Sequence, residues 1–277
     1  KPLAALNASA DAVRLPLGGS RKSKCKSAAQ KALLLLQLQI NGTPLGSDFA
    51  SCAHPLTQFG GRVLRAMADY AVERRLYGVL ATSLQLSKAL ARGCGWYDAP
   101  AAHVQQFDGI GPGYASRLAQ AQACELSTFA QLTALRLESI LGKGGAVIAA
   151  SLRSARQLLG SALGLDYELR ADGAAGPRAP VHVSIKIAPK AGGGAVDGAP
   201  ARSRWALLVG DANGVLLLYR TFGQADVPLQ ARLTVPPSSS GVRVQARLIN
   251  RDHFGLDEQL ELRMPRGAPE HAEPFAI

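Results

Sequence analysis

Hydrophobic residues recur with helical spacing through the first part of the chain. Val63, Met67 and Tyr70 follow one another at intervals of four and three residues, as on one face of an amphipathic helix. Residues 41–44 are Asn-Gly-Thr-Pro, in which a glycine that ends helices precedes a proline that cannot continue one. The pattern predicts helices over residues 28–40, 57–76 and 78–92.

The spacing of hydrophobic residues changes from that of a helix to that of a strand near residue 170. Val181, Val183, Ile185 and Ile187 alternate with polar residues, which is the period of two of a half-buried strand. Residues 211–214, Asp-Ala-Asn-Gly, separate two apolar runs, and Asn-Gly supplies the positive φ that a tight hairpin needs. About six strands of this kind suit a small antiparallel sandwich. They are expected at residues 181–187, 205–209, 215–219, 232–235, 242–249 and 258–263.

The change of period divides the chain into several expected parts. At 277 residues the chain approaches the size at which single cores split into domains. Residues 171–180 contain only Ala, Asp, Gly, Arg and Pro and cannot bury enough apolar surface to fold alone, so they form a linker. Because the first residue is Lys1, we expect a fragment of a longer protein. The expected parts are a basic lead-in segment 1–25, a helical bundle 26–98, a helix-hairpin-helix subdomain 99–170, the linker 171–180 and a β-sandwich 181–277.

The predicted fold class is therefore α+β multidomain. An all-α helical bundle with a helix-hairpin-helix is followed by an all-β sandwich of the immunoglobulin or fibronectin kind. Residues 32–40 form the longest apolar run, far short of the roughly 20 residues that a membrane span needs. We expect no membrane association.

The charge of the chain is concentrated in its first part. Residues 1–170 hold 19 Lys and Arg against 10 Asp and Glu, whereas residues 171–277 hold 12 against 10. Such an excess favours a polyanionic partner, because neutralising phosphates releases counterions without any reading of sequence. A basic surface that only keeps the protein soluble is the alternative.

Residues 104–118, VQQFDGIGPGYASRL, carry the pattern of a helix-hairpin-helix. Gly109 and Gly111 allow a sharp turn, and the free N–H groups that open the second helix point outward with the positive end of its dipole. A phosphate oxygen fits there, with Gly113 and Arg117 facing the nucleic-acid backbone. No base edge is read, so binding would have no sequence preference. The alternative is a hairpin that only packs helices or contacts protein.

A second candidate contact is the pair Arg62 and Arg65. Their i, i+3 spacing places both on one helix surface, where they could touch a strand's phosphates. The alternative is a solvated face on which Arg65 pairs with Asp69. The run of Arg and Lys in residues 21–26 is interpreted as an unstructured basic loop.

Signatures of catalysis are missing from the sequence. It has no GxxxxGK[ST] phosphate loop and no GxSxG elbow, and its five histidines show no metal-ligand spacing. Its four cysteines lie tens of residues apart, without a CxxC pair, and fit a reducing compartment. We expect no catalytic residue, no metal ligand and no cofactor in this chain, which would not be an enzyme by itself.

Several stretches of the chain resemble a known family. The order of bundle, helix-hairpin-helix and sandwich resembles the Sec-sixty-three domain of Ski-two-like helicases and of an ER translocon subunit. The resemblance covers roughly residues 13–264. The matching stretches are residues 14–17 (RLPL), 61–70 (GRVLRAMADY), 84–90 (LQLSKAL) with Trp96, 205–211 (WALLVGD) and 253–257 (HFGLD).

The resemblance implies a function beyond what the pattern shows. Among branches of the family, the chain looks most similar to the meiotic crossover DNA helicase. The helix matching residues 61–76 resembles the ratchet helix, which lies across the single strand leaving the motor, so Arg62 and Arg65 would be strand contacts. The expected role is a non-catalytic, nucleic-acid-guiding accessory region of an ATP-dependent DNA helicase.

The expected surroundings follow from that role. ATP and Mg would bind only in motor domains that precede residue 1. The expected partners are single-stranded or branched DNA, those motor domains and a protein on the sandwich, and the expected location is the nucleus. The alternative is a protein-interaction scaffold module of an ER translocation subunit or of a spliceosomal RNA helicase.

Overall fold

Two compact units make up the chain in the computed structural model, which describes residues 2–9, 13–16, 24–142, 144, 146–171, 181–190, 203–235 and 243–263. The first, called the helical unit here, comprises Lys1–Asp69, Thr82–Arg156 and His253–Gly255. The second, called the sheet unit, comprises Tyr70–Ala81, Gln157–Asp252 and Leu256–Ile277. The predicted domain limits stay predictions. Residues 172–180 of the expected linker and residues 21–23 of the basic run lie outside the described residues.

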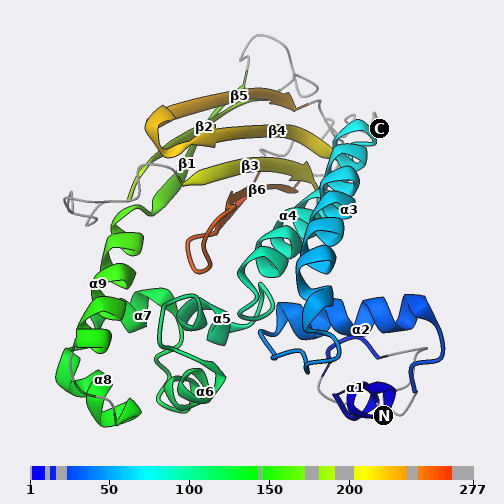
Figure 1. Ribbon diagram of the computed structural model, residues 1–277. Helices are drawn as coiled ribbons and strands as arrows, with labels where there is room; N and C mark the ends of the chain where they lie inside the picture. Colours follow the sequence, from blue (N-terminus) through cyan, green and yellow to red (C-terminus); the bar gives the residue numbers. More distant parts are fainter. Residues whose placement is uncertain are drawn as a thin grey trace, which may run out of the picture. The chain divides into compact units, whose positions relative to one another are not determined.

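Helices dominate the described chain up to residue 160 (Figure 1). The predicted helix 28–40 is confirmed by α2, in which the Ser27 hydroxyl accepts a hydrogen bond from the Gln30 N–H at the N-terminus. The helix predicted for 57–76 begins four residues earlier, because Pro55 is tolerated in a first turn, and ends at Glu73, before Arg75 adopts φ +54°. The elements are α1 (Pro2–Ala8), α2 (Ala28–Ile40), η3 (Ala50–Cys52), α3 (Ala53–Glu73), α4 (Tyr77–Arg92), α5 (Pro100–Gln105), α6 (Pro112–Gln120), α7 (Leu126–Gln131), α8 (Ala134–Leu141) and α9 (Ala146–Gly160).

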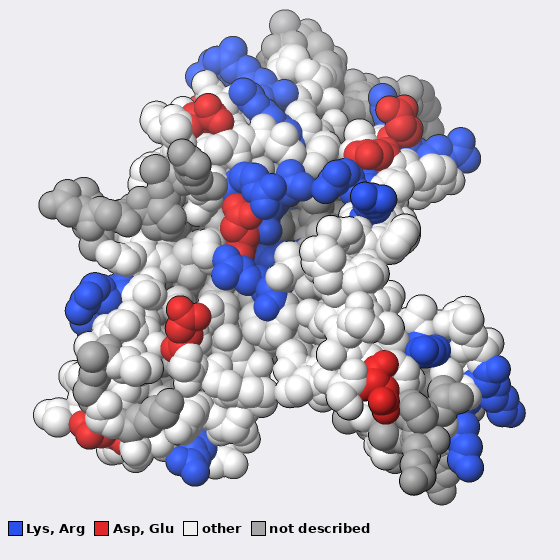
Figure 2. All heavy atoms as spheres, viewed as in Figure 1, with Lys and Arg blue, Asp and Glu red and all other residues white. Residues whose placement is uncertain are grey.

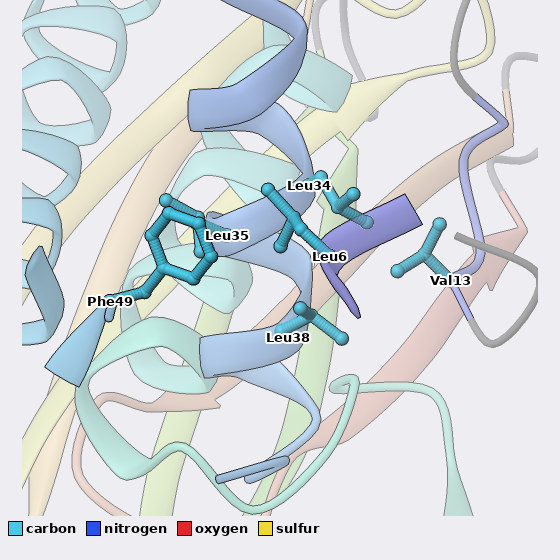
Figure 3. Close-up of a cluster of buried hydrophobic side chains, with 6 residues drawn as sticks. All are labelled: Leu6, Val13, Leu34, Leu35, Leu38 and Phe49. Carbon is cyan, nitrogen blue, oxygen red and sulfur yellow. The ribbon is translucent and has the colours of Figure 1, made fainter. Parts of the chain in front are cut away.

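Two hydrophobic clusters lie in the core of the helical unit. In the first, Leu34, Leu35 and Leu38 of α2 meet Leu6 of α1, with Val13 and Phe49 beside them (Figure 3). In the second, Leu90 of α4 packs with Phe254, which is 1% exposed. Gly60 of α3 lies against this region, since a Cβ there would be 2.6 Å from Leu90 Cδ2. Phe49 lies in the first cluster, and Phe254, Trp96 and Tyr97 lie in or against the second, so aromatic residues contribute more than the composition of the chain predicts.

Seven antiparallel strands of the described residues form two sheets in the sheet unit. One sheet has the order β1-β2-β5 and the other has the order β4-β3-β6-β7. Contacts of β1 with β7 and of β4 with β5 join the sheet edges. The α+β class is thus confirmed. The strands are β1 (Leu163–Ala171), β2 (Val181–Pro189), β3 (Arg204–Asp211), β4 (Leu216–Gly223), β5 (Leu229–Val235), β6 (Arg243–Asn250) and β7 (Glu258–Arg263), and η4 (Gln224–Asp226) follows β4.

The prediction that the helical pattern extends to residue 170 is wrong. Strand β1 begins at Leu163 and pairs along its length with β2, from Leu163 opposite Pro189 to Ala171 opposite Val181. Residues 163–170, LGLDYELR, alternate apolar with polar or small residues, which is the period of two of a strand, and sequence reasoning missed this signal. The predicted hairpin at residues 211–214 is confirmed, with φ +78° at Gly214.

Candidate nucleic-acid interface

Residues 100–120 form two short helices, α5 and α6, joined by a tight turn, and this segment is called the α5–α6 hairpin below. Gly109 adopts φ +80°, and a Cβ there would lie 2.8 Å from Val147 Cγ1, so both conformation and space favour glycine. Ala115 and Leu118 of α6 are fully buried, and the ring of Phe107 stacks on Phe129 of α7 with centroids 5.7 Å apart. The hairpin is therefore anchored on one side by its own apolar residues.

The other side of the hairpin exposes the N-terminus of α6. Gly111 is the N-cap residue, and no side chain caps the helix there. Tyr114 and Ala115 donate their N–H groups to the Gly111 carbonyl, at 3.1 and 3.0 Å, whereas Pro112 has no N–H to donate. Gly111 and Gly113 are exposed, and a Cβ at either would meet nothing within 4 Å. Gly113 thus lies exposed in the first turn of α6, at the positive end of the helix dipole.

Arg117 is exposed on α6 but already has a partner in the protein. Its Nη1 donates to the Leu141 carbonyl at 3.3 Å, and its guanidinium lies 5.9 Å from the centre of the Tyr114 ring. Leu141 ends α8, where Gly142 follows with φ +65°. Arg117 therefore satisfies a carbonyl at a helix end, a role that spacing alone does not reveal.

Arg62 and Arg65 project from α3, and both are exposed. The Arg62 guanidinium lies 5.7 Å from the centre of the Phe59 ring, one turn earlier. Within the described residues, Arg65 makes no ion pair with Asp69 or with any other acid. No hydrogen bond or ion pair joins this pair to the α5–α6 hairpin in that part of the chain. The two sets of predicted residues share the helical unit but form separate contacts.

The same helix exposes apolar side chains that the sequence analysis assigned to an amphipathic face. Phe59, Val63 and Met67 are 65%, 57% and 44% exposed. The less exposed row is offset by one residue, about 100° around the helix, and contains the half-buried Gly60 and Leu64 and the buried Ala68. Helix α3 thus presents an apolar stripe to solvent beside Arg62.

Sequence reasoning missed how firmly residues 253–255 hold the hairpin. The side chain of Gln106, in the turn after α5, makes two hydrogen bonds with the backbone of Phe254, and Lys88 Nζ donates to the His253 carbonyl at 3.2 Å. A Cβ at Gly255, which has φ +80°, would lie 2.7 Å from Leu126 Cβ. The motif His-Phe-Gly carried no recognisable chemistry, so only the fold shows this role.

Basic residues outnumber acidic ones in the helical unit. The helical unit contains 16 Lys and Arg against 7 Asp and Glu. On the face drawn in Figure 2, Lys and Arg side chains form separate groups, with Asp and Glu side chains among them. In the described parts of the chain, no cluster of three or more His, Cys, Asp or Glu side chains could hold a metal ion, and no helix is long and apolar enough to span a membrane.

Comparison with known proteins places the chain in a family. No curated protein matches it. Among solved structures, it is similar to the sensor domain of the anti-sigma factor RsgI4 in Pseudobacteroides cellulosolvens, with 8% identity over 36% of this chain and 93% of the other, and a TM-score of 0.22 that is too low to inform the fold. The family model of the Sec63 Brl domain matches residues 2–263. The chain therefore belongs to the Sec63 Brl domain family.

Proposed function

We propose that this chain is the non-catalytic, nucleic-acid-guiding region of an ATP-dependent DNA helicase of the meiotic recombination type, acting in the nucleus. Sec63 Brl domains are non-catalytic and occur in helicases and in translocation proteins. In this proposal the α5–α6 hairpin is a helix-hairpin-helix that holds a strand by its phosphates, and the sheet unit is an immunoglobulin-like sandwich. ATP and Mg bind in motor domains elsewhere in the parent protein.

The exposed, uncapped N-terminus of α6 is the observation that carries the proposal. No side chain caps the N-terminus of α6, and Gly113 in its first turn is exposed. The helix dipole favours negative charge there, which suits a phosphate. Arg62 and Arg65, exposed on α3, supply further cations, and the basic balance of the helical unit supports long-range attraction of a polyanion.

The strand order also supports the sandwich part of the proposal. The orders β1-β2-β5 and β4-β3-β6-β7, with the edges of the two sheets in contact, suit two sheets that share one core. Trp205 of β3 is fully buried, as an inward residue of such a core would be.

A protein-interaction scaffold, as in a translocation subunit or a spliceosomal helicase, is the second candidate function. It is favoured by the exposed apolar stripe Phe59, Val63 and Met67. It is also favoured by Arg117, which is engaged with the Leu141 carbonyl. Under this alternative the α5–α6 hairpin would only pack helices.

Fluorescence anisotropy with a labelled 20-nucleotide single strand, across a salt series, tests the proposal. We expect binding of the chain to weaken as salt rises. The logarithm of the association constant should fall with the logarithm of the salt concentration, with a slope of about −0.7 for each phosphate neutralised on a single strand. The double substitution Arg62→Ala with Arg65→Ala should weaken binding for every nucleotide sequence. It should also reduce the magnitude of this slope by about 1.4, because two phosphate contacts are lost.

The matched control for that variant is Arg136→Ala with Arg153→Ala, which removes two exposed arginines from α8 and α9. It should lower affinity less than the α3 variant. Absence of binding at low salt, binding indifferent to salt, or equal losses for the two double variants would reject the proposal. An RNA strand of the same length shows whether the region prefers DNA.

A further inference from the structure

The outward face of the three-stranded sheet carries three rows of polar side chains. Strands β1, β2 and β5 bury Val183, Ile185 and Ile187 toward the core and turn every alternate residue outward. The register places the outward residues in three rows across the strands. The rows are Asp166-Lys186-Gln230, Glu168-Ser184-Arg232 and Arg170-His182-Thr234.

A groove of about 480 Å³ runs over these rows. Its walls carry Glu168 and Arg170 from β1, His182 and Ser184 from β2, and Arg232 and Thr234 from β5. Neither the phosphate-contact proposal nor the core of the sheet unit uses this face.

Several of the polar groups on the face pair with one another. Lys186 donates from Nζ to Glu168 Oε1, and this hydrogen bond lowers the pKa of Glu168, so the pair is charged and mutually neutralised at neutral pH. Gln230 Nε2 donates to Ser184 Oγ at 2.5 Å, and His182 Nδ1 lies 3.1 Å from Thr234 Oγ1. The pairing fixes the side chains between β2 and its two neighbours.

Two arginines, Arg170 and Arg232, are the charged groups of the groove lining that make no ion pair within the described residues, and Asp166, which makes none either, lies outside that lining. Arg232 makes no hydrogen bond or ion pair within the described residues, and Arg170 acts on Glu168 only through its electrostatic field. They lie on the two outer strands, offset by one row, so their Cα atoms are roughly 12 Å apart for strands spaced about 4.8 Å. An extended peptide covers this distance with about four residues.

We propose that this groove binds an extended acidic segment of a partner protein, whose carboxylates pair with Arg170 and Arg232. Arginine offers two parallel donors that match a carboxylate, and residues i and i+4 of an extended peptide lie on one side of it. His182 and Ser184 of the central strand β2 lie between the two arginines, where polar side chains of the peptide pass.

A peptide fits the groove better than a nucleic-acid strand does. The outward rows contain no Phe, Tyr or Trp on which bases could stack, although strand-binding sheets rely on such stacking.

Amide chemical shifts of the isotopically labelled 277-residue chain, titrated with a defined peptide, test the inference. The probe is a capped heptapeptide of alternating Ser and Glu with three Glu, and the comparison peptide has Gln in place of each Glu. We expect the Glu peptide to shift the resonances of residues 182–184 and 232–234, and the Gln peptide to leave them unchanged. Arg170→Gln with Arg232→Gln should weaken binding about tenfold, because each loses a charge-assisted contact.

The matched control is Arg220→Gln, an exposed arginine on β4 of the other sheet, which should bind the Glu peptide as the parent chain does. Shifts confined to α3 or α6, or equal affinity in the double variant, would overturn the inference. So would an octathymidine strand that shifts residues 182–184 and 232–234 while the Glu peptide does not. Localisation of the shifts in the parent chain requires no variant, so the test stands even if a substitution impairs folding.

Discussion

The side-chain amide of Gln106 pairs with the backbone of Phe254 in both directions. Gln106 Nε2 donates to the Phe254 carbonyl at 3.1 Å, and the Phe254 N–H donates to Gln106 Oε1 at 3.0 Å. The glutamine amide thus satisfies both backbone groups of Phe254, as a neighbouring strand would. Phe254 is 1% exposed. A residue in the turn that precedes α6 is therefore fixed by a segment 148 positions later.

Replacing Gln106 with Ala should lower the stability of the helical unit. The change leaves the Phe254 N–H and carbonyl, which are partly buried, without their partners. Each unsatisfied group costs about 1–3 kcal/mol. We expect the free energy of unfolding to fall by about 2 kcal/mol or more, measured by calorimetry. Gln120→Ala, at the exposed end of α6, is the control and should change it by less than about 0.5 kcal/mol. Equal effects of the two substitutions would contradict this account.

Gly210→Ala should destabilise the sheet unit. A Cβ at Gly210 of β3 would lie 2.5 Å from two ring carbons of Tyr77, which is buried. Overpacking of this kind costs about 1–3 kcal/mol. Gly78→Ala is the matched control, because nothing lies within 4 Å of that Cβ and alanine favours an exposed helix. Thermal unfolding should show a lower midpoint for the first variant and an equal or higher one for the second.

Alanine should affect the stability of α3 differently at its two adjacent glycines, Gly60 and Gly61. Gly61 has open space around its Cβ position, so Gly61→Ala should stabilise the helix by up to about 1 kcal/mol. Gly60→Ala places a methyl group 2.6 Å from Leu90 Cδ2 and 3.2 Å from Leu36 Cδ2, so repacking offsets the helical gain. Urea titration of both variants measures the difference. An equal gain at both positions would show that α3 does not pack against α4 at Gly60.

Cys94 should resist alkylation in the folded protein. Burial raises the pKa of its thiol to about 11, so at pH 8 only about one molecule in a thousand carries the reactive thiolate. Burial also raises the pKa of the Cys124 thiol. Iodoacetamide at pH 8, followed by peptide mass spectrometry, should modify the half-buried Cys25 and Cys52 first. Chain unfolded in urea is the control, in which all four cysteines should react at similar rates.

The periodic parts of the fold are predictable from the sequence for a simple physical reason. Residues 28–40 and the hairpin at 211–214 carry local signals, an apolar helical run and an Asn-Gly turn, that act without distant contacts. Strand β1 carries a local signal of the same kind, because residues 163–170, LGLDYELR, alternate apolar with polar or small residues. Sequence reasoning missed this alternation, and the pairing of the strand with β2 shows that it begins at Leu163.

Part of the candidate site could likewise be predicted from the sequence, and part could not. The turn at Gly109 and the N-terminus of α6 follow from local backbone rules and could be placed from residues 104–118. The bond from Arg117 to the Leu141 carbonyl depends on how α6 and α8 pack, which no spacing shows. The exposed stripe at Phe59 and Val63 has the same origin, since periodicity identifies an apolar face without showing what covers it.

Substitution of Gly113 by Glu tests the proposed phosphate contact most directly. An acid in the first turn stabilises a helix, and the open space at Gly113 accommodates the side chain, so folding should be preserved while phosphate is repelled. Anisotropy with a labelled 20-nucleotide single strand at low salt should show binding weakened about tenfold or more. Gly113→Gln matches the size and Gln120→Glu matches the charge, at the other end of α6, and both should stay within about threefold of the parent chain. Equal affinity of Gly113→Glu and Gly113→Gln would contradict the proposal that the N-terminus of α6 holds a phosphate.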